Sequence, residues 1–327
     1  MEKINLLLVD KSLIDYDLFI CSSSFENRCL EIANKVNSKQ FKKVIVCHFE
    51  DNYIEAENNL SKMEKLFVDK CTVIKLYKNN PLSNYDSLFD EINNSECLNV
   101  LFDISTFTRE MFLIILQLFR MPTFANKKLT VCYNPSDKYS SVQKNKLDEL
   151  WLSKGVDNIR SVLGFSGDFS PIKKLLLIVL VGFEAERSQI LIDSFEPNLL
   201  FIGKASKKES ANDEIAQINE INFQKLIKKN SDAKQFEFSC MDLSFTVKSI
   251  SQIIETYQKS YNIVISPMCN KLSTLAVASV VFKYPEVQIC YASTNLYNID
   301  AYSTPSKYIY TIEANELEPT NNNPHKK

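Results

Sequence analysis

The chain has 327 residues, of which 45% are hydrophobic, and its 38 basic and 40 acidic side chains leave a formal charge of -2 at pH 7. This length predicts two domains with substantial cores, and so small a net charge argues against sequence-independent binding of DNA or RNA. No apolar run is long enough to span a membrane and the N-terminus lacks a signal-peptide pattern, so we expect a cytoplasmic protein.

Short β-branched runs alternate with amphipathic stretches through the first half of the chain, a pattern typical of βαβ units in a parallel sheet. The predicted strands cover residues 17–22, 43–49, 71–77, 99–105 and 129–134. The predicted helices cover about residues 26–37, 54–68, 84–94 and 107–121. Most strands are continuous apolar runs, which indicates a sheet covered by helices on both faces.

The second half repeats this order of elements. Its predicted strands cover residues 175–182, 198–204, 236–242, 262–267 and 287–293, with helices between them. We therefore predict an α/β fold with two tandem Rossmann-like domains, each a five-stranded, mainly parallel sheet in the order 3-2-1-4-5 with helices on both faces. The two domains are expected to be related by a pseudo-twofold axis.

Three pairs of matching segments indicate a tandem duplication. The pairs stand 158 to 163 residues apart: Ser24–Arg28 with Gly182–Arg187, Asp103–Arg109 with Ser266–Lys271, and Tyr133–Pro135 with Tyr291–Ser293. Agreement at three places in the same order is not expected by chance. The predicted boundaries are a first domain with an N-terminal extension at 1–140, a helical linker at 141–172, a second domain at 173–315 and a disordered tail at 316–327. One more strand is expected near residues 304–314.

The scarcity of histidine and glycine excludes several kinds of site. There are only two histidines, and His48, at the end of an apolar run, is best interpreted as a packed strand-end residue. The nine cysteines are scattered without C-x-x-C spacing, which favours buried, reduced thiols. Five glycines form neither a G-x-G-x-x-G motif nor a Walker loop. We expect no bound metal and no resident cofactor.

Polar side chains occupy the turns that follow the first and fourth strands of each half. An open doubly wound sheet binds its ligands between these two turns. Helix N-termini at these turns offer free N–H groups and the positive end of the helix dipole, and the basic side chains would add charge for a phosphate. The candidate ligand-binding residues are Ser22, Ser23, Glu26, Arg28, Ser105, Thr106, Thr108, Arg109, Tyr133, Glu184, Arg187, Ser266, Asn270, Lys271 and Tyr291.

Each group of candidates also has a structural interpretation. The glutamates and arginines after the first strands could cap helices and pair with one another at the surface. The tyrosines could stack on a base or simply pack at a domain seam. Asp103 is the candidate catalytic acid or base, and it could instead be only a helix-cap residue. Asp103 has no counterpart in the second half, where Ser266 aligns nearby. Such an asymmetry is expected if a duplicated fold keeps a single catalytic centre.

Two strand-turn-helix segments carry a resemblance to a known family. VISPMCNKLSTLAVASVVF and VLFDISTFTREMFLIILQLF resemble the ligand-binding turn of the CRISPR-associated Rossmann fold (CARF) domains, and two fused units resemble the SAVED sensors of prokaryotic antiphage signalling. The family's glycines are absent from both turns. The residues onto which the resemblance can be carried are Ser105, Thr106, Thr108 and Arg109 in the first half and Ser266, Asn270 and Lys271 in the second.

The resemblance implies a sensor or regulatory protein of an antiphage defence system, which binds a nucleotide or another phosphorylated small ligand. No effector domain is visible, so the output would pass through a partner effector protein, in a complex or a homo-oligomer. The alternatives are a nucleotide-processing hydrolase on the same duplicated scaffold, with Asp103 as acid or base and Arg109 or Lys271 holding the phosphate, or a structural subunit of a defence complex.

Overall fold

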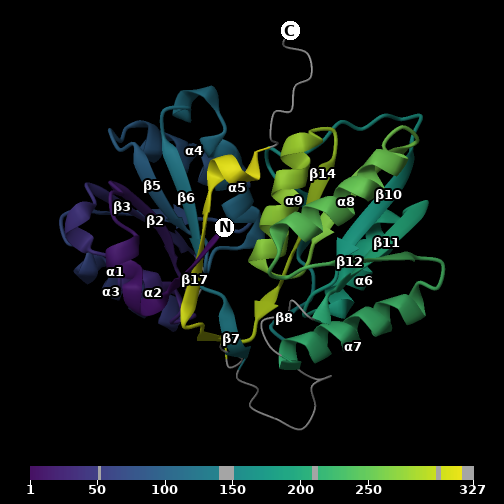
Figure 1. Ribbon diagram of the computed structural model, residues 1–327, viewed down its shortest axis with the longest axis horizontal. Coiled ribbons are helices and arrows are strands. Elements are labelled where there is room, and N and C mark those ends of the chain that lie inside the picture. Colours follow the sequence, from purple (N-terminus) through teal and green to yellow (C-terminus); the bar gives the residue numbers. More distant parts are fainter. Residues whose placement is uncertain (51–52, 140–150, 208–212, 300–302, 319–327) are drawn as a thin grey trace.

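The chain folds into two β-sheets, each with helices packed on it, which lie side by side in Figure 1. The computed structural model describes residues 1–50, 53–139, 151–207, 213–299 and 303–318. Both sheets are dominated by parallel strands. The predicted α/β class is therefore confirmed, and no helix of the described residues is long and apolar enough to cross a membrane.

The first sheet has seven strands in the order β1-β17-β6-β5-β2-β3-β4. These are β1 (Glu2–Asn5), β2 (Leu18–Ser23), β3 (Lys43–Phe49), β4 (Cys71–Leu76), β5 (Asn99–Asp103), β6 (Lys128–Tyr133) and β17 (Tyr308–Glu313). Strands β2 to β6 are parallel and follow the predicted 3-2-1-4-5 order. Strands β17 and β1 extend this parallel core in antiparallel fashion.

The second sheet has six strands in the order β12-β11-β10-β13-β14-β9. These are β9 (Asn158–Ser161), β10 (Lys174–Leu180), β11 (Leu199–Ala205), β12 (Lys234–Phe238), β13 (Tyr261–Pro267) and β14 (Gln288–Ser293). Its five parallel strands repeat the order of the first sheet, and β9 adds to the edge in antiparallel fashion. The prediction of five-stranded sheets is thus wrong in strand number, because each parallel core gains antiparallel strands at one edge.

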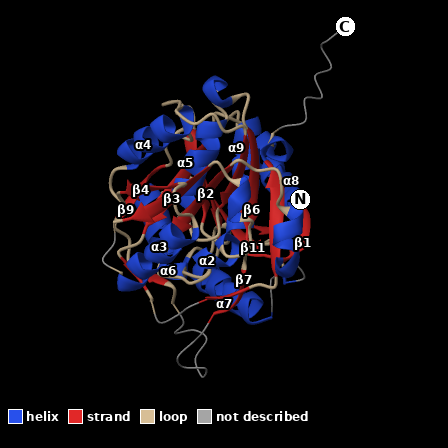
Figure 2. Cartoon of the chain, turned by 90° about the vertical axis from the view of Figure 1, so that its left-hand side faces the viewer, coloured by secondary structure: helices blue, strands red, loops and turns tan. Residues whose placement is uncertain are grey.

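Helices cover both faces of the sheets, as the continuous apolar strands predict. They are α1 (Val9–Ser12), α2 (Cys29–Ala33), α3 (Ile54–Leu66), α4 (Pro81–Asn93), α5 (Arg109–Phe119), α6 (Ala185–Phe195), α7 (Asp213–Lys229), α8 (Leu243–Tyr257) and α9 (Lys271–Lys283). Figure 2 shows α2 and α3 in front of the strands of the first sheet, with which both are in contact. α4 and α5 lie on the other face of that sheet and contribute to its core on that side.

α5 and α9 pack against each other where the two halves meet. The sequences REMFLIILQLF and KLSTLAVASVVFK are apolar nearly all round, and most of their residues are buried. A helix of this kind is stable only when it is covered on every side. One hydrophobic core accordingly continues from the first sheet through both helices to the second sheet.

The segments that follow the fifth parallel strand of each half cross over to the other half. β17 follows the second half in sequence but pairs with β6 of the first sheet, and it is the yellow strand beside β6 in Figure 1. β9 follows the first half and pairs with β14 of the second sheet. Two small ladders complete the exchange, β7 (Ser136–Tyr139) with β16 (Ser303–Pro305) and β8 (Ser153–Lys154) with β15 (Leu296–Tyr297).

This exchange corrects the predicted boundaries. The linker was expected to be helical, yet its described part, residues 151–172, contains β8 and β9; residues 140–150 lie outside the described chain. The second unit was expected to keep residues up to 315, yet β17 belongs to the first sheet. The physical reason is that β6 and β14 would otherwise be open edges with unpaired backbone groups.

The tail was expected to be disordered from residue 316. A 3-10 turn, Ala314–Leu317, instead follows β17, with Leu317 buried. The N-terminal ammonium of Met1 donates to Glu316 at 2.5 Å. Residues 316–318 therefore belong to the fold, and residues 319–327 lie outside the described chain.

Candidate ligand-binding cavity

A cavity of about 300 Å³ lies between the two halves, beyond the carboxyl ends of the parallel strands. Turns after β2, β3 and β5 form its wall on one side, and turns after β10, β13 and β14 form it on the other. Ten of the predicted ligand-binding residues line it: Ser23, Glu26, Arg28, Thr106, Thr108, Arg109, Glu184, Arg187, Lys271 and Tyr291. Both halves therefore contribute their polar turns to one shared cavity.

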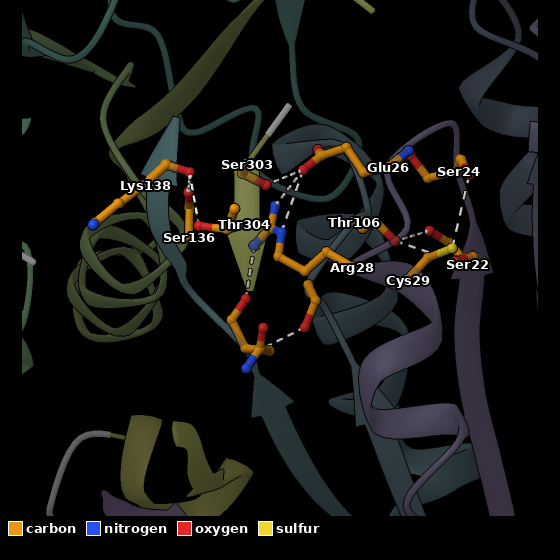
Figure 3. Close-up of polar contacts among 12 residues, drawn as sticks. Ser22, Ser24, Glu26, Arg28, Cys29, Thr106, Ser136, Lys138, Ser303 and Thr304 are labelled. Carbon is orange, nitrogen blue, oxygen red and sulfur yellow. Dashed lines mark hydrogen bonds and ion pairs between the residues drawn. The ribbon is translucent and has the colours of Figure 1, made fainter. Parts of the chain in front are cut away.

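A buried ion pair stands on the first-half wall. The Arg28 guanidinium donates to Glu26 Oε2 from Nη2 at 3.1 Å and from Nε at 3.3 Å, and its Nη1 donates to the Asn134 carbonyl at 2.7 Å. Ser303, from the exchanged segment β16, donates to the same Glu26 oxygen at 2.5 Å (Figure 3). Burial opposes the charge of Glu26, but Arg28, Ser303 and Lys271 outweigh it and lower the pKa of this carboxyl.

The second-half wall carries the matching arrangement. Arg187 Nη2 lies 2.8 Å from Glu184 Oε2, and Ser153 Oγ donates to Glu184 Oε1 at 2.6 Å. Ser153 comes from β8, the exchanged segment after the first half. Each glutamate-arginine pair is thus held by a serine that arrives from the chain segment following the other half. The predicted surface pairs are instead buried pairs, since both arginines are nearly inaccessible.

Arg109 begins helix α5 and reaches across to the second half. Its Nη2 donates to the carbonyl of Met268 at 3.3 Å and to the carbonyl of Cys269. Its buried Nε has no hydrogen-bond partner among the described residues. The preceding residue, Thr108, caps α5 by accepting from the Met111 N–H at 3.2 Å. Arg109 therefore holds the turn between β13 and α9 while one polar atom stays unsatisfied.

Lys271 begins helix α9 and is the corresponding cation of the second half. Within the described part of the chain its ammonium has no hydrogen bond and no ion pair. Burial lowers the pKa of Lys271 to about 7, and the charges of Arg28 and Arg109 lower it further against the attraction of Glu26 and Asp103. The positive end of the helix dipole also disfavours a cation at this position. Glu26 and Asp103 therefore attract the ammonium only from a distance, and no carboxylate of the described residues forms an ion pair with it.

Aromatic side chains line the same cavity, and most of them are not among the ligand-binding residues predicted from the sequence. Phe25 lies 5.1 Å from Tyr53 and 5.7 Å from Tyr297 between ring centroids. Phe183, at the position of the second half that matches Phe25, also lines the wall. The recurrence of Phe-Glu in both halves was the signal that would have found this pair. Tyr53 carried no such signal, since it precedes α3 with no counterpart in the second half.

Five of the predicted ligand contacts support the turns from behind the cavity wall. Ser22 Oγ lies 3.0 Å from Thr106 Oγ1, and Ser105 Oγ accepts from the Asn134 N–H at 2.8 Å. Asn270 caps α9 by accepting from the Ser273 N–H at 2.9 Å. The remaining two are the buried residues Ser266 and Tyr133. Their assignment as lining residues is corrected: short polar side chains at strand ends satisfy neighbouring backbone groups before they reach a ligand.

Asp103 is also buried away from the cavity wall. Asp103 is the last residue of β5, and its Oδ1 accepts from the Ser105 N–H at 2.8 Å. This hydrogen bond closes a turn of the backbone. Burial raises the pKa of Asp103 to about 6, although Ser105, Arg28 and Lys271 lower it. With 3% of its surface exposed and no place among the lining residues, Asp103 fits the structural interpretation better than the catalytic one.

Comparison with known proteins adds little to this geometry. No family model matches the chain, and no curated protein matches it. Among solved structures the chain is similar to a universal stress protein from Archaeoglobus fulgidus DSM 4304, with 11% identity, coverage of 85% of this chain and 96% of that chain, and a TM-score of 0.23. So distant a likeness has no bearing on ligand or activity.

Proposed function

We propose that the protein binds a nucleotide-type, phosphorylated small molecule in the cavity between its two halves. The observation that carries the proposal is Lys271, a half-buried lysine that lines the cavity at a helix N-terminus and has no hydrogen bond or ion pair among the described residues. Among the same residues, Arg109 beside it has only carbonyl acceptors and an unsatisfied Nε. A phosphate would neutralise both cations and accept from the free N–H groups of the helix.

The shape and lining of the cavity favour a single nucleotide over a larger ligand. A volume of about 300 Å³ stands at the lower end of the range for small-molecule sites. The ring cluster of Phe25, Tyr53 and Tyr297 offers faces on which a base can stack. Cations at one part of the wall and aromatic rings at another match the two chemically different ends of a nucleotide.

The role we propose is that of a sensor or regulatory protein that acts through a partner. A ligand that touches both halves would shift the population of wall conformations, and a partner effector would recognise the favoured one. Because the halves exchange strands and share a core, we expect the turns of the wall to move more than the halves themselves. The resemblance of both strand-turn-helix segments to CARF and SAVED sensors supports a place in antiphage defence.

Nucleotide binding is tested by isothermal titration of the full chain with AMP, ATP, a cyclic dinucleotide and inorganic phosphate. We expect micromolar binding of a mononucleotide and at least tenfold weaker binding by Lys271→Met, since a charge-assisted hydrogen bond is worth roughly 1.5–3 kcal/mol. Lys248→Met, which removes an exposed lysine of α8, is the matched control. If no nucleotide binds or raises the melting temperature, the chain is better regarded as a structural subunit.

The alternative of a hydrolase that uses Asp103 is tested by Asp103→Asn. This variant retains the oxygen that accepts from Ser105, and we expect it to bind the nucleotide within about twofold of the unmodified protein because Asp103 is not part of the wall. Turnover of a nucleotide that is lost in Asp103→Asn would favour the hydrolase instead.

A further inference from the structure

A serine, a histidine and a glutamate form a hydrogen-bonded chain that ends at the cavity. Ser23 is the last residue of β2, and His48 is its register partner on the adjacent strand β3. Ser23 Oγ lies 2.7 Å from His48 Nδ1, and His48 Nε2 lies 3.1 Å from Oε1 of Glu57 on α3. Ser23 lines the cavity, whereas Glu57 is exposed on the outside. The chain therefore runs from solvent through a buried imidazole to the proposed ligand.

The direction of these hydrogen bonds follows from the carboxylate. Glu57 can only accept, so the proton of the neutral imidazole lies on Nε2 and the lone pair lies on Nδ1. Ser23 must then donate its hydroxyl proton to Nδ1, which is the arrangement of a serine activated by a general base and an orienting acid.

The same cavity supplies positive charge for a developing oxyanion. Lys271 and Arg109 line the wall together with Ser23. Cations in a water-poor site stabilise the negative charge of a tetrahedral intermediate more strongly than they do in water. The nucleophile and its base therefore lie at the carboxyl ends of β2 and β3, and the electrostatic support comes from the first residues of α5 and α9.

We propose that Ser23 is a nucleophile activated by His48, and that the cavity hydrolyses an acyl ester of a small anionic molecule. This inference rests on the proposed anionic ligand, because Lys271 and Arg109 are taken to hold its charged group. The neutral carbonyl carbon of such a ligand can approach Ser23 while the anionic group stays with the cations. Ester hydrolysis is an activity beyond binding, and it uses neither Asp103 nor a cofactor.

The reaction proceeds in two balanced steps. Ser23 Oγ attacks the acyl carbon, its proton passes to His48 Nδ1, and the carbon–oxygen bond to the alcohol breaks as His48 returns that proton to the leaving oxygen. Water then attacks the acyl-serine, gives a proton to His48, and the acid is released as the proton returns to Ser23 Oγ. Glu57 holds the imidazole throughout and acts as a positioning residue.

The test is covalent labelling with diisopropyl fluorophosphate, which forms an oxygen–phosphorus bond to an activated serine and releases fluoride. We expect one label per chain, mapped to Ser23 by mass spectrometry, and no label on Ser23→Ala. His48→Gln should slow labelling at least a hundredfold. Glu57→Gln should slow it at least tenfold, and because Glu57 is exposed this variant keeps the test decisive if the buried histidine variant does not fold.

Ser251→Ala, which removes a buried serine of α8 away from the cavity, is the control and should be labelled like the unmodified protein. No label on Ser23, or a label that His48→Gln and Glu57→Gln leave unchanged in rate, would overturn the nucleophile. Titration with mononucleotides on the same samples separates the two proposals: binding without labelling removes only the hydrolysis, and labelling without nucleotide binding removes only the proposed ligand.

Discussion

Lys271 combines three unfavourable conditions in one side chain: burial, two neighbouring arginines and the positive end of a helix dipole. Burial and the charges of Arg28 and Arg109 lower the pKa of its ammonium to about 7. A lysine in such surroundings is typical of a functional site. Its charge lowers the stability of the folded protein but is needed to bind an anionic ligand. The buried pairs Glu26–Arg28 and Glu184–Arg187 differ in this respect, because each of these charges already has its counter-ion.

We predict that Lys271→Met stabilises the ligand-free protein and weakens nucleotide binding. Lys271 is half-buried and has no ion pair among the described residues, so replacing it by an apolar side chain should raise the free energy of unfolding by about 1 kcal/mol. Urea denaturation at pH 7 measures this change, with Lys248→Met as the reference. A destabilised Lys271→Met protein would show that the ammonium has a partner that neutralises it.

The lowered pKa of Lys271 also predicts a pH dependence with a definite sign. An unfolded lysine titrates near pH 10.4, so between pH 7 and about pH 10 the unfolded chain binds the proton that the folded chain has lost, and the contribution of Lys271 to stability rises with pH. Nucleotide affinity should fall over the lower part of this range as the ammonium loses its charge. Urea denaturation and nucleotide titration at pH 6, 7 and 8.5 measure the two trends. Both the rise in stability and the fall in affinity should be smaller in Lys271→Met.

At the level of elements, the site depends on a close approach between two turns of the second half. Gly182 follows β10, and a Cβ at this position would meet the carbonyl oxygen of Met268 and lie 2.7 Å from the Cα of Cys269. Met268 and Cys269 belong to the turn that leads into α9, and their carbonyl oxygens accept from Arg109. Only glycine leaves space for the turns at the switch point of this sheet to touch.

Gly182→Ala is expected to destabilise the protein by about 1–3 kcal/mol, because both clashing atoms belong to the backbone and cannot rotate away. The variant should also weaken nucleotide binding, since the carbonyl groups that hold Arg109 must shift. Urea denaturation and the nucleotide titration measure the two effects. Unchanged stability would mean that the turns are farther apart than the structure has them.

At the level of the whole molecule, the two halves cannot be separated along the chain. The parallel core of each sheet pairs with an antiparallel strand from the segment that follows the other half, β17 in one case and β9 in the other. The same segments bring Ser303 to Glu26 and Ser153 to Glu184. A single core runs through α5 and α9. Site and fold are therefore built by both halves together.

Fragments cut at the predicted boundary should consequently fail to fold alone. Residues 1–172 carry β9 without its sheet and lack β17, and residues 173–327 carry β17 without its sheet and lack β9. We expect the intact chain to unfold in urea as one transition, with circular dichroism and Trp151 fluorescence coinciding. Neither fragment should show a cooperative transition, whereas their mixture should recover one. A fragment that unfolds cooperatively by itself would contradict the interlocked fold.

Local patterns in the sequence were enough to predict the ten parallel strands, their order and the four turns that carry Arg28, Arg109, Arg187 and Lys271. These follow from local patterns, since apolar runs, helical periodicity and the repeat are written in neighbouring residues. The partners of β9 and β17 become known only from the three-dimensional structure. The structure also shows that Ser23 lines the cavity whereas Ser22 and Asp103 lie behind its wall. Edge pairing and side-chain exposure depend on residues more than a hundred positions away, which no local pattern records.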